Sequence, residues 1–225
     1  PLSDGGYIAK HILVRAYHNF VQTGQMSPND RLLRAIRMKP MRTLSGVTTV
    51  TVLTKPYPCP GNCIFCPEDE LLPKSYLRKE PGAARAFQNQ FDPYLQVASR
   101  LESYQAIGHP TDKVELLILG GCWTAYPREY QEWFIQRCLD ALNGTESASL
   151  LEAQENNEGT SHRNVGLVVE TRPDEINAGT IIFLRHLGVT KVQLGAQSFN
   201  DEILIRNWRG HSAAATLKAT ALLRA

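Results

Sequence analysis

The sequence predicts an α/β fold, a partial TIM-like (β/α) barrel preceded by a helical segment. Two observations support this prediction. Four β-branched runs recur along the chain, and a segment of helical length and pattern follows each one. The runs are continuously apolar, as in VELLILGG, which is typical of parallel strands covered on both faces. Because βαβ connections share one hand, such a series curls towards a partial barrel or an open sheet.

Residues 1–46 are expected to form a basic helical segment. Tyr7 to Thr23 and Asn29 to Met38 are the predicted helices, and the second begins after Ser27-Pro28 and ends before Pro40. Basic residues outnumber acids seven to one between positions 10 and 46, although the whole chain carries a net charge of only +2. This uneven distribution is more informative about binding partners than the net charge of the whole chain.

The second predicted helix carries a candidate nucleic-acid-binding stripe. Arg31, Arg34 and Arg37 recur at three-residue spacing and should therefore share one helix face. Together with Lys39 and Arg42 they could neutralise phosphates of a nucleic acid. The alternative is a helix face that is simply solvated.

Residues 47–225 are expected to form the core, with about four βα units. The predicted strands are Val47–Thr54, Val114–Gly121, Val165–Thr171 and Lys191–Ser198. The predicted helices are Ala83–Ile107, Arg128–Leu142, Asp174–His186 and Ser212–Arg224. The fourth strand would present an unpaired edge unless another segment or a second copy covers it.

The composition indicates a soluble protein, with 43% hydrophobic and 20% charged residues. No apolar run approaches the roughly 18 residues that a membrane span needs, and the first residues lack the pattern of a signal peptide. Five cysteines is an odd count, and three of them crowd into one loop, which argues against a disulfide framework. We therefore expect reduced thiols, a cytoplasmic location and no membrane association.

The three crowded cysteines predict an iron–sulfur site. Cys59, Cys63 and Cys66 form a CxxxCxxC pattern directly after the first predicted strand. Three thiolates can hold three irons of a 4Fe-4S cluster, which leaves the fourth iron open to a small molecule. A structural zinc site, the main alternative, takes four protein ligands, commonly as paired CxxC motifs, and the sequence contains no second CxxC.

The other predicted strands also end in groups that can bind a ligand. The second strand ends in Gly120-Gly121, the third in Glu170-Thr171-Arg172, and the fourth in Gly195-Ala196-Gln197-Ser198. In parallel α/β folds the carboxyl ends of the strands converge, so these groups should lie near the cysteines. Taken singly, each has an ordinary explanation as a turn or as the polar end of a strand.

Taken together, these motifs resemble the radical S-adenosylmethionine enzymes, and more narrowly the Elongator catalytic subunit family of enzymes that modify the wobble uridine of tRNA. The resemblance rests on LSGV before the cysteine loop, DKVE with ILGG, ETRPD, QLGAQSF and the NxRGH pattern of NWRGH, in the order that this family has them. The chain resembles the radical domain of that family without its acetyltransferase domain, and with fewer βα repeats. The implied fold is a barrel of the radical S-adenosylmethionine type.

The resemblance also implies roles for individual residues. Cys59, Cys63 and Cys66 would ligate the cluster, and Phe65 would pack against the adenine of S-adenosylmethionine. The remaining implied cofactor contacts are Gly120 and Gly121 to the amino group, Glu170 and Gln197 to the ribose or methionine portion, and Arg172 and Arg209 to anionic parts of either ligand. Cys122 stands where an acid often follows the glycines, and we interpret it as a packed thiol. Cys138, within a predicted helix, should lie in the core.

The implied reaction transfers a carboxymethyl group derived from acetyl-CoA to C5 of the wobble uridine. Acetyl-CoA would be a co-substrate engaged through the acetyltransferase domain, tRNA would be the substrate, and a homodimer or accessory subunits are further candidate partners. Two alternatives remain open. GAQSF also resembles oxygen-independent coproporphyrinogen oxidases, and the cysteine loop could instead be the zinc site of a non-catalytic RNA-binding module.

Overall fold

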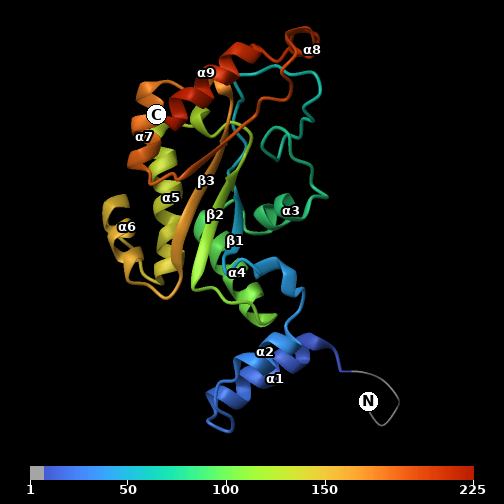
Figure 1. Cartoon of the computed structure of the whole chain (residues 1–225), viewed down its shortest axis with the longest axis vertical. Coiled ribbons are helices and arrows are strands. Elements are labelled where there is room, and N and C mark those ends of the chain that lie inside the picture. Colours follow the sequence, from blue (N-terminus) through green and yellow to red (C-terminus); the bar gives the residue numbers. More distant parts are fainter. Residues whose placement is uncertain (1–7) are drawn as a thin grey trace.

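A parallel sheet runs through the middle of the molecule (Figure 1). The computed structural model describes residues 8–225, and within them the strands lie side by side in chain order. These strands are β1 (Thr48–Leu53), β2 (Lys113–Leu119), β3 (Arg163–Thr171) and β4 (Lys191–Leu194). Every neighbouring pair is parallel. The predicted α/β class is confirmed, and the four strands form an open, twisted sheet in this part of the chain.

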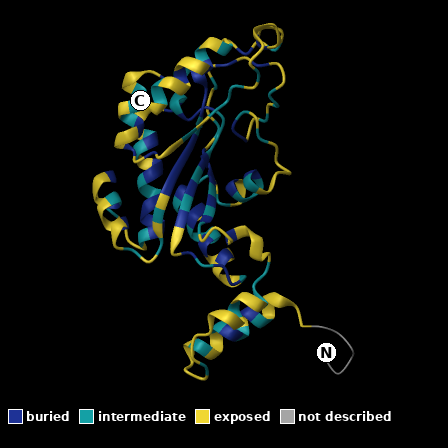
Figure 2. Ribbon diagram, in the orientation of Figure 1, coloured by how far each residue is buried: buried dark blue, intermediate teal, exposed yellow. Residues whose placement is uncertain are grey.

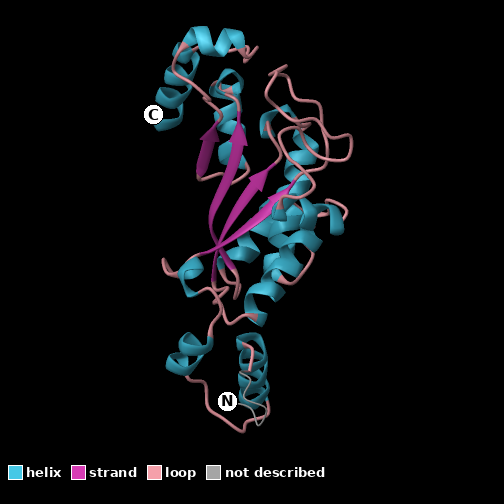
Figure 3. Cartoon of the chain, turned by 90° about the vertical axis from the view of Figure 1, so that its right-hand side faces the viewer, coloured by secondary structure: helices cyan, strands magenta, loops and turns pink. Residues whose placement is uncertain are grey.

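One face of the sheet forms the main hydrophobic core. Helices α4 (Pro93–Ala106) and α5 (Arg128–Asn143) pack against each other, with α4 on β1 and α5 on β3 (Figure 3). Leu116 and Ile118 of β2 belong to the same buried cluster as Phe134 and Leu142 of α5, and each of the four is at most 1% exposed. Figure 2 shows the buried residues, in dark blue, gathered along the sheet and the helices beside it. Burial of each such side chain contributes about 1.5–3 kcal/mol to folding.

The second face of the sheet is less covered than the sequence predicted. Thr51 and Leu117 are register partners on this face, and both are only half-buried among the described residues. Continuous apolar runs predict burial on both faces. Alternating burial along β1 and β2 instead marks one packed face and one partly open face. One further helix, α3 (Pro81–Gln88), contacts β1.

Two further helices lie beyond the amino ends of the strands. α1 (Lys10–Gln22) and α2 (Asp30–Ile36) contact each other, and the short 3-10 turn Pro40–Thr43 leads from them into β1 (Figure 1). The backbone N–H of Met38 donates to the carbonyl O of Ile107 at 3.1 Å, which ties this segment to the end of α4. Tyr7, where the first helix was predicted to begin, lies outside the described residues.

The remaining helices surround the carboxyl ends of the strands or flank the sheet. They are α6 (Leu150–Glu158), α7 (Ala178–His186), α8 (Asp201–Arg206) and α9 (Ala213–Arg224). α6 and α8 were not predicted, and both begin at side-chain caps, Ser149 and Asn200, that accept backbone N–H groups. Within residues 8–225 no helix has the length and apolar character needed to cross a membrane.

Several predicted boundaries are wrong, each for a local reason. The single helix predicted from Ala83 to Ile107 is two helices, because Gln90 and Phe91 adopt left-handed backbone conformations and Asp92 caps a new start. The fourth strand ends at Leu194 and not at Ser198. α2 ends at Ile36, so Arg37 is its C-terminal cap and does not share the helix with Arg31 and Arg34.

Candidate cluster and cofactor site

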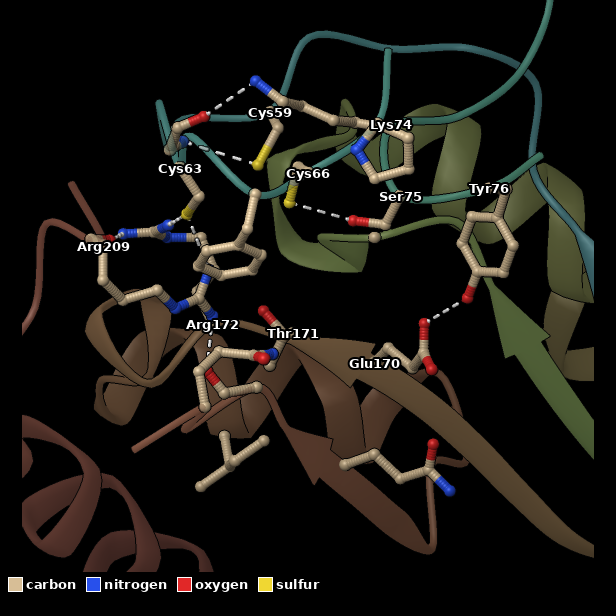
Figure 4. A pocket seen from close by; sticks show the side chains of 18 residues that line it. Cys59, Cys63, Cys66, Lys74, Ser75, Tyr76, Glu170, Thr171, Arg172 and Arg209 are labelled. Atoms are coloured by element: carbon tan, nitrogen blue, oxygen red, sulfur yellow. Dashed lines mark hydrogen bonds between the residues drawn. The ribbon is translucent and has the colours of Figure 1, made fainter. Parts of the chain in front are cut away.

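The loops that follow all four strands meet around one cavity at the carboxyl edge of the sheet (Figure 4). The cavity has a volume of about 510 Å³, which is within the range of small-molecule sites. Its predicted lining residues are Cys59, Cys63, Phe65 and Cys66 after β1, Gly121 after β2, Glu170 at the end of β3 and Arg172 just after it, and Gln197 and Arg209 from the chain after β4. Convergence at this edge follows from the parallel topology.

The three cysteines lie on a long irregular loop, residues 55–80, which contains no helix or strand. Cys59 Sγ accepts the backbone N–H of Gly61 at 3.4 Å, and Cys66 Sγ lies 3.2 Å from Ser75 Oγ. All three are free thiols, and burial raises the pKa of Cys59 above its ordinary value. Lys74 ties the loop together because its Nζ donates to the carbonyl O of Gly61 at 3.4 Å. All three cysteines of the loop line the same cavity.

Two buried arginines converge on the middle cysteine. Arg209 Nη1 donates to Cys63 Sγ at 3.2 Å, and Arg172 Nη1 lies 3.9 Å from the same sulfur. Arg172 is 4% exposed and Arg209 is 6% exposed. Asp174 pairs with Arg172 at 2.7 Å, whereas Arg209 donates to the carbonyl O of Gly195. Positive charge is thus concentrated beside a cysteine that is itself 5% exposed.

Glu170 is held by a residue that the sequence analysis did not single out. Its carboxylate accepts the hydroxyl of Tyr76 at 2.7 Å (Figure 4). Burial raises the pKa of Glu170, and the hydrogen bond from Tyr76 opposes that rise. The pKa of Tyr76 lies well above its ordinary value, chiefly because of burial and then because of the neighbouring carboxylate. Tyr76 therefore stays a neutral hydrogen-bond donor at physiological pH.

The two glycines after β2 have different roles in the fold. Gly121 lines the cavity and adopts a positive φ of 87°. Gly120 does not line it, and its φ is 152°. A Cβ on Gly120 would come within 1.8 Å of Thr54 Oγ1 at the end of β1. Close packing between strand ends thus requires glycine at position 120, while position 121 leaves backbone open to the cavity.

The two cysteines outside the loop are buried, as predicted. Cys122 is 3% exposed, and its Sγ lies 3.6 Å from Thr171 Oγ1 and 3.5 Å from Thr124 Oγ1. Cys138 is 0% exposed within the core, and burial raises its pKa well above the ordinary value. Neither side chain lines the cavity.

Further cavity residues were not among the predicted contacts. These are Gly61, Pro67, Lys74, Ser75 and Tyr76 from the cysteine loop, with Thr171, Gln193, Leu194 and Gly195 at strand ends. The one available signal was the polar run Lys74-Ser75-Tyr76 that follows the cysteines in the same loop. The predicted basic stripe lies elsewhere, beyond the amino ends of the strands. Of that stripe, Arg37 Nε donates to the carbonyl O of Gly108 at 2.7 Å.

The residues around the cavity fit an iron–sulfur cluster. Three thiolates are soft ligands for iron, and a cluster held by three of them is anionic. The buried arginines supply matching charge, because two guanidinium groups stand against one carboxylate, Asp174. Arg209 Nε has no hydrogen-bond partner among the described residues. In that same part of the chain, no three Cys, His, Asp or Glu side chains converge as one metal ion, such as zinc, would need.

The comparisons with known proteins agree with this site. The family model of the radical SAM superfamily matches residues 57–225, which is most of the chain and includes the cysteine loop. The chain therefore belongs to the radical SAM superfamily.

Within that superfamily the similar proteins fall under two names. A tRNA uridine(34) acetyltransferase of Methanocaldococcus infernus is 50% identical over 199 residues, which cover 86% of this chain and 37% of that protein. An Elongator complex protein 3 of Drosophila melanogaster is 36% identical over 84% of this chain and 36% of its own length. The chain thus spans little more than a third of the curated relatives it matches.

A solved structure gives the same result. The archaeal Elp3 of Methanocaldococcus infernus, with an N-terminal deletion of residues 1–46, matches with a TM-score of 0.64 and 43% identity. The match covers 77% of this chain and 34% of that one. The resemblance to the Elongator catalytic subunit family that the motifs indicated is confirmed by these similarities.

Proposed function

We propose that this chain is the radical S-adenosylmethionine part of an enzyme that modifies the wobble uridine of tRNA. The observation that carries the proposal is the meeting of three cysteines with the polar ends of β2, β3 and β4 around one cavity. The names of the relatives, tRNA uridine(34) acetyltransferase and Elongator complex protein 3, supply the substrate. The reaction we propose adds a carboxymethyl group derived from acetyl-CoA to C5 of that uridine.

In this proposal Cys59, Cys63 and Cys66 would hold a 4Fe-4S cluster, and S-adenosylmethionine would bind beside it. The bound cluster supplies one electron for reductive cleavage of S-adenosylmethionine, which is chemistry of the cofactor and not of the protein. The protein's part is to bind, orient and shield. With S-adenosylmethionine bound, the strand-end loops around it would limit the access of water to the reacting atoms.

The proposal gives individual lining residues contacts to S-adenosylmethionine. Gly121 would let its backbone approach the amino group, because no side chain stands in the way. Glu170 would accept hydrogen bonds from the ribose hydroxyls or the amino group, and Tyr76 holds its carboxylate in place at 2.7 Å. Phe65, which is partly exposed at the cavity, would pack against the adenine. Gln197 would contact the ribose or methionine portion.

We propose that residues 1–46 form a basic segment that binds tRNA, next to the core of residues 47–225. Arg31, Arg34, Lys39 and Arg42 are exposed, as phosphate contacts must be. Arg37 is partly buried and bonded to Gly108, so it is a weaker candidate than the others. Helix α2 lies beyond the amino ends of the strands (Figure 1), whereas the cavity lies at their carboxyl ends. The stripe would therefore bind tRNA away from the modified base.

The remaining parts of the proposal concern partners and location. Acetyl-CoA would be engaged by an acetyltransferase domain, as the name of the relatives suggests. A homodimer or accessory subunits would complete the assembly. The reduced, cysteine-based site favours a cytoplasmic location.

The test is anaerobic reconstitution of the chain with iron and sulfide, followed by dithionite and S-adenosylmethionine. We expect a brown protein that releases 5′-deoxyadenosine and methionine, with Cys138→Ala as a matched cysteine control that keeps both properties. Acetyl-CoA and tRNA are then added, and the nucleosides are analysed by mass spectrometry for 5-carboxymethyluridine. Stoichiometric zinc after reconstitution, without cleavage of S-adenosylmethionine, would overturn the proposal.

A further inference from the structure

Two positive side chains meet at a single sulfur, although they come from distant parts of the chain. Arg172 follows β3, and Arg209 follows α8. Their Nη1 atoms lie 3.9 Å and 3.2 Å from Cys63 Sγ (Figure 4). Neither Cys59 nor Cys66 has an arginine contact of this kind among the described residues: Cys59 accepts a backbone N–H and Cys66 meets a serine hydroxyl. Among the three cysteines of the loop, Cys63 is therefore the one whose sulfur has arginine contacts in the described part of the chain.

The charge around Cys63 is not balanced by acids. Arg172 donates to both carboxylate oxygens of Asp174, at 3.0 and 2.7 Å. Arg209 contacts no carboxylate within the described residues; its partners are the carbonyl O of Gly195 and the sulfur itself. The carboxylate of Glu170, which also lines the cavity, is bonded to Tyr76. A buried guanidinium without a counter-charge is costly unless an anion occupies the space beside it.

The arginines are also held rigidly. Arg172 Nη2 donates to the backbone carbonyl O of Arg209 at 2.8 Å, so the Arg172 guanidinium is tied to the segment that carries Arg209. The Arg172 guanidinium lies so close to Gly61 that a Cβ there would come within 2.0 Å of its Nη1. The backbone N–H of Ile64 donates to the carbonyl O of Asn207 at 3.3 Å, which joins the cysteine loop to the segment that carries Arg209. The charge therefore sits at a fixed place relative to the sulfur.

We infer that Arg209 is a positioning residue for the cluster, held by Arg172, and that its charge at Cys63 favours the reduced form of the bound cluster. The inference rests on the proposed cluster. Adding one electron, supplied by an external one-electron donor, makes the site more negative by one charge. A fixed positive group in a poorly solvated site stabilises that form, and hydrogen bonds to the sulfur ligands act in the same direction. In this inference Arg209 acts on Cys63 Sγ, a cluster ligand that the protein itself supplies.

The competing interpretation is a purely structural tie between loops, and substitutions of opposite sign separate the two. Arg209→Gln removes the charge, and Asp174→Asn removes the acid that offsets Arg172. The reduction midpoint of the reconstituted cluster is measured by titration with dithionite, followed by electron paramagnetic resonance, together with iron and sulfide per chain. We expect a more negative midpoint for Arg209→Gln and a less negative one for Asp174→Asn.

Two controls complete the experiment. Arg209→Lys keeps the charge and should lie between wild type and Arg209→Gln, and Arg206→Gln removes an exposed arginine of α8 and should match wild type. If Arg209→Gln binds too little cluster to be measured, the changes in reduction midpoint of Arg209→Lys and Asp174→Asn still distinguish a charge effect from a structural tie. Unchanged midpoints in those two, or shifts of the same sign, overturn the inference. A wild-type chain that takes up no cluster overturns the proposed function itself, whereas a loaded wild type with unresponsive variants overturns only this inference.

Discussion

Arginine side chains at the two ends of the sheet lie in opposite environments. At the carboxyl end Arg172 and Arg209 are almost completely buried and are fixed by hydrogen bonds. At the amino end Arg31 and Arg34 stand exposed on a short helix. A buried charge acts strongly on one fixed group and is little affected by salt, whereas an exposed charge is screened and suits a large polyanion. The environment of an arginine therefore indicates what kind of ligand it can bind better than its presence in a motif does.

The largest expected effect comes from removing a cluster ligand at the carboxyl end. Cys63→Ala should lose nearly all reconstituted iron, brown colour and cleavage of S-adenosylmethionine, because only two thiolates remain in the loop. The measurement is iron and sulfide per folded chain. Cys122→Ala is the matched control, since Cys122 is buried beside the cavity without lining it. Equal iron in Cys63→Ala and wild type would remove Cys63 from the ligand set.

A second prediction tests the packing that positions the site. Gly120→Ala should destabilise the chain by about 3 kcal/mol, or roughly 6–12 °C in Tm, because the new Cβ collides with Thr54. Gly24→Ala at the amino end is the control: Gly24 also has a positive φ, 72°, but a Cβ there meets nothing within 4 Å. We expect a cost of about 1 kcal/mol for Gly24→Ala. Similar melting temperatures for the two variants would show that the strand ends are less tightly packed than described.

A third prediction concerns the amino end. Reversing Arg31 and Arg34 to glutamate should weaken tRNA binding about 10- to 100-fold at low salt and lower the slope of log affinity against log salt by about 2. Iron content should be unchanged, because the helix lies far from the cavity. Filter binding or fluorescence anisotropy at several salt concentrations provides the measurement. Reversing Arg185 of α7 and Arg206 of α8, which are both exposed, is the charge-matched control. Unchanged affinity would exclude this surface as the tRNA contact.

The smallest effect is expected from Glu170. Burial raises its pKa in the folded chain, so its contribution to stability is present below the unfolded pKa, about 4.3, and is lost as pH rises through the folded value. Glu170→Gln cannot ionise and can still accept the Tyr76 hydroxyl. The cluster-free variant should therefore melt about 1–3 °C higher than wild type at pH 8.

The same measurement at lower pH checks the sign. The difference in Tm between Glu170→Gln and wild type should shrink as pH falls towards 5, because wild-type Glu170 becomes protonated. A variant less stable than wild type at pH 8 would contradict the direction of the pKa shift. Tyr76→Phe should behave oppositely to Glu170→Gln, since it removes the donor that stabilises the carboxylate.

Local sequence patterns predicted most of the scaffold. β-branched runs located all four strands, and the cysteine loop and the strand ends located about half of the residues that line the cavity, because parallel topology alone brings such ends together. The break between α3 and α4 was missed because neither Gln90 nor Phe91 usually signals left-handed backbone, although Asp92-Pro93 is a typical helix start. Tyr76 was missed because it lies in an irregular loop, where no periodicity shows which way a side chain points. The contact of Arg209 with Cys63 spans 146 positions, and spacing along the chain cannot reveal it.

The unequal burial of the five thiols has a practical consequence for handling the protein. Cys59 and Cys66 are partly exposed, whereas Cys63, Cys122 and Cys138 are almost inaccessible. Oxidants and alkylating reagents reach thiols in order of exposure, so damage in air should begin at the two ends of the triplet. Brief alkylation of the folded, cluster-free chain should then add about two groups, while the denatured chain would add all five. The mass of the alkylated chain thus reports how much of a preparation is still folded and free to accept iron.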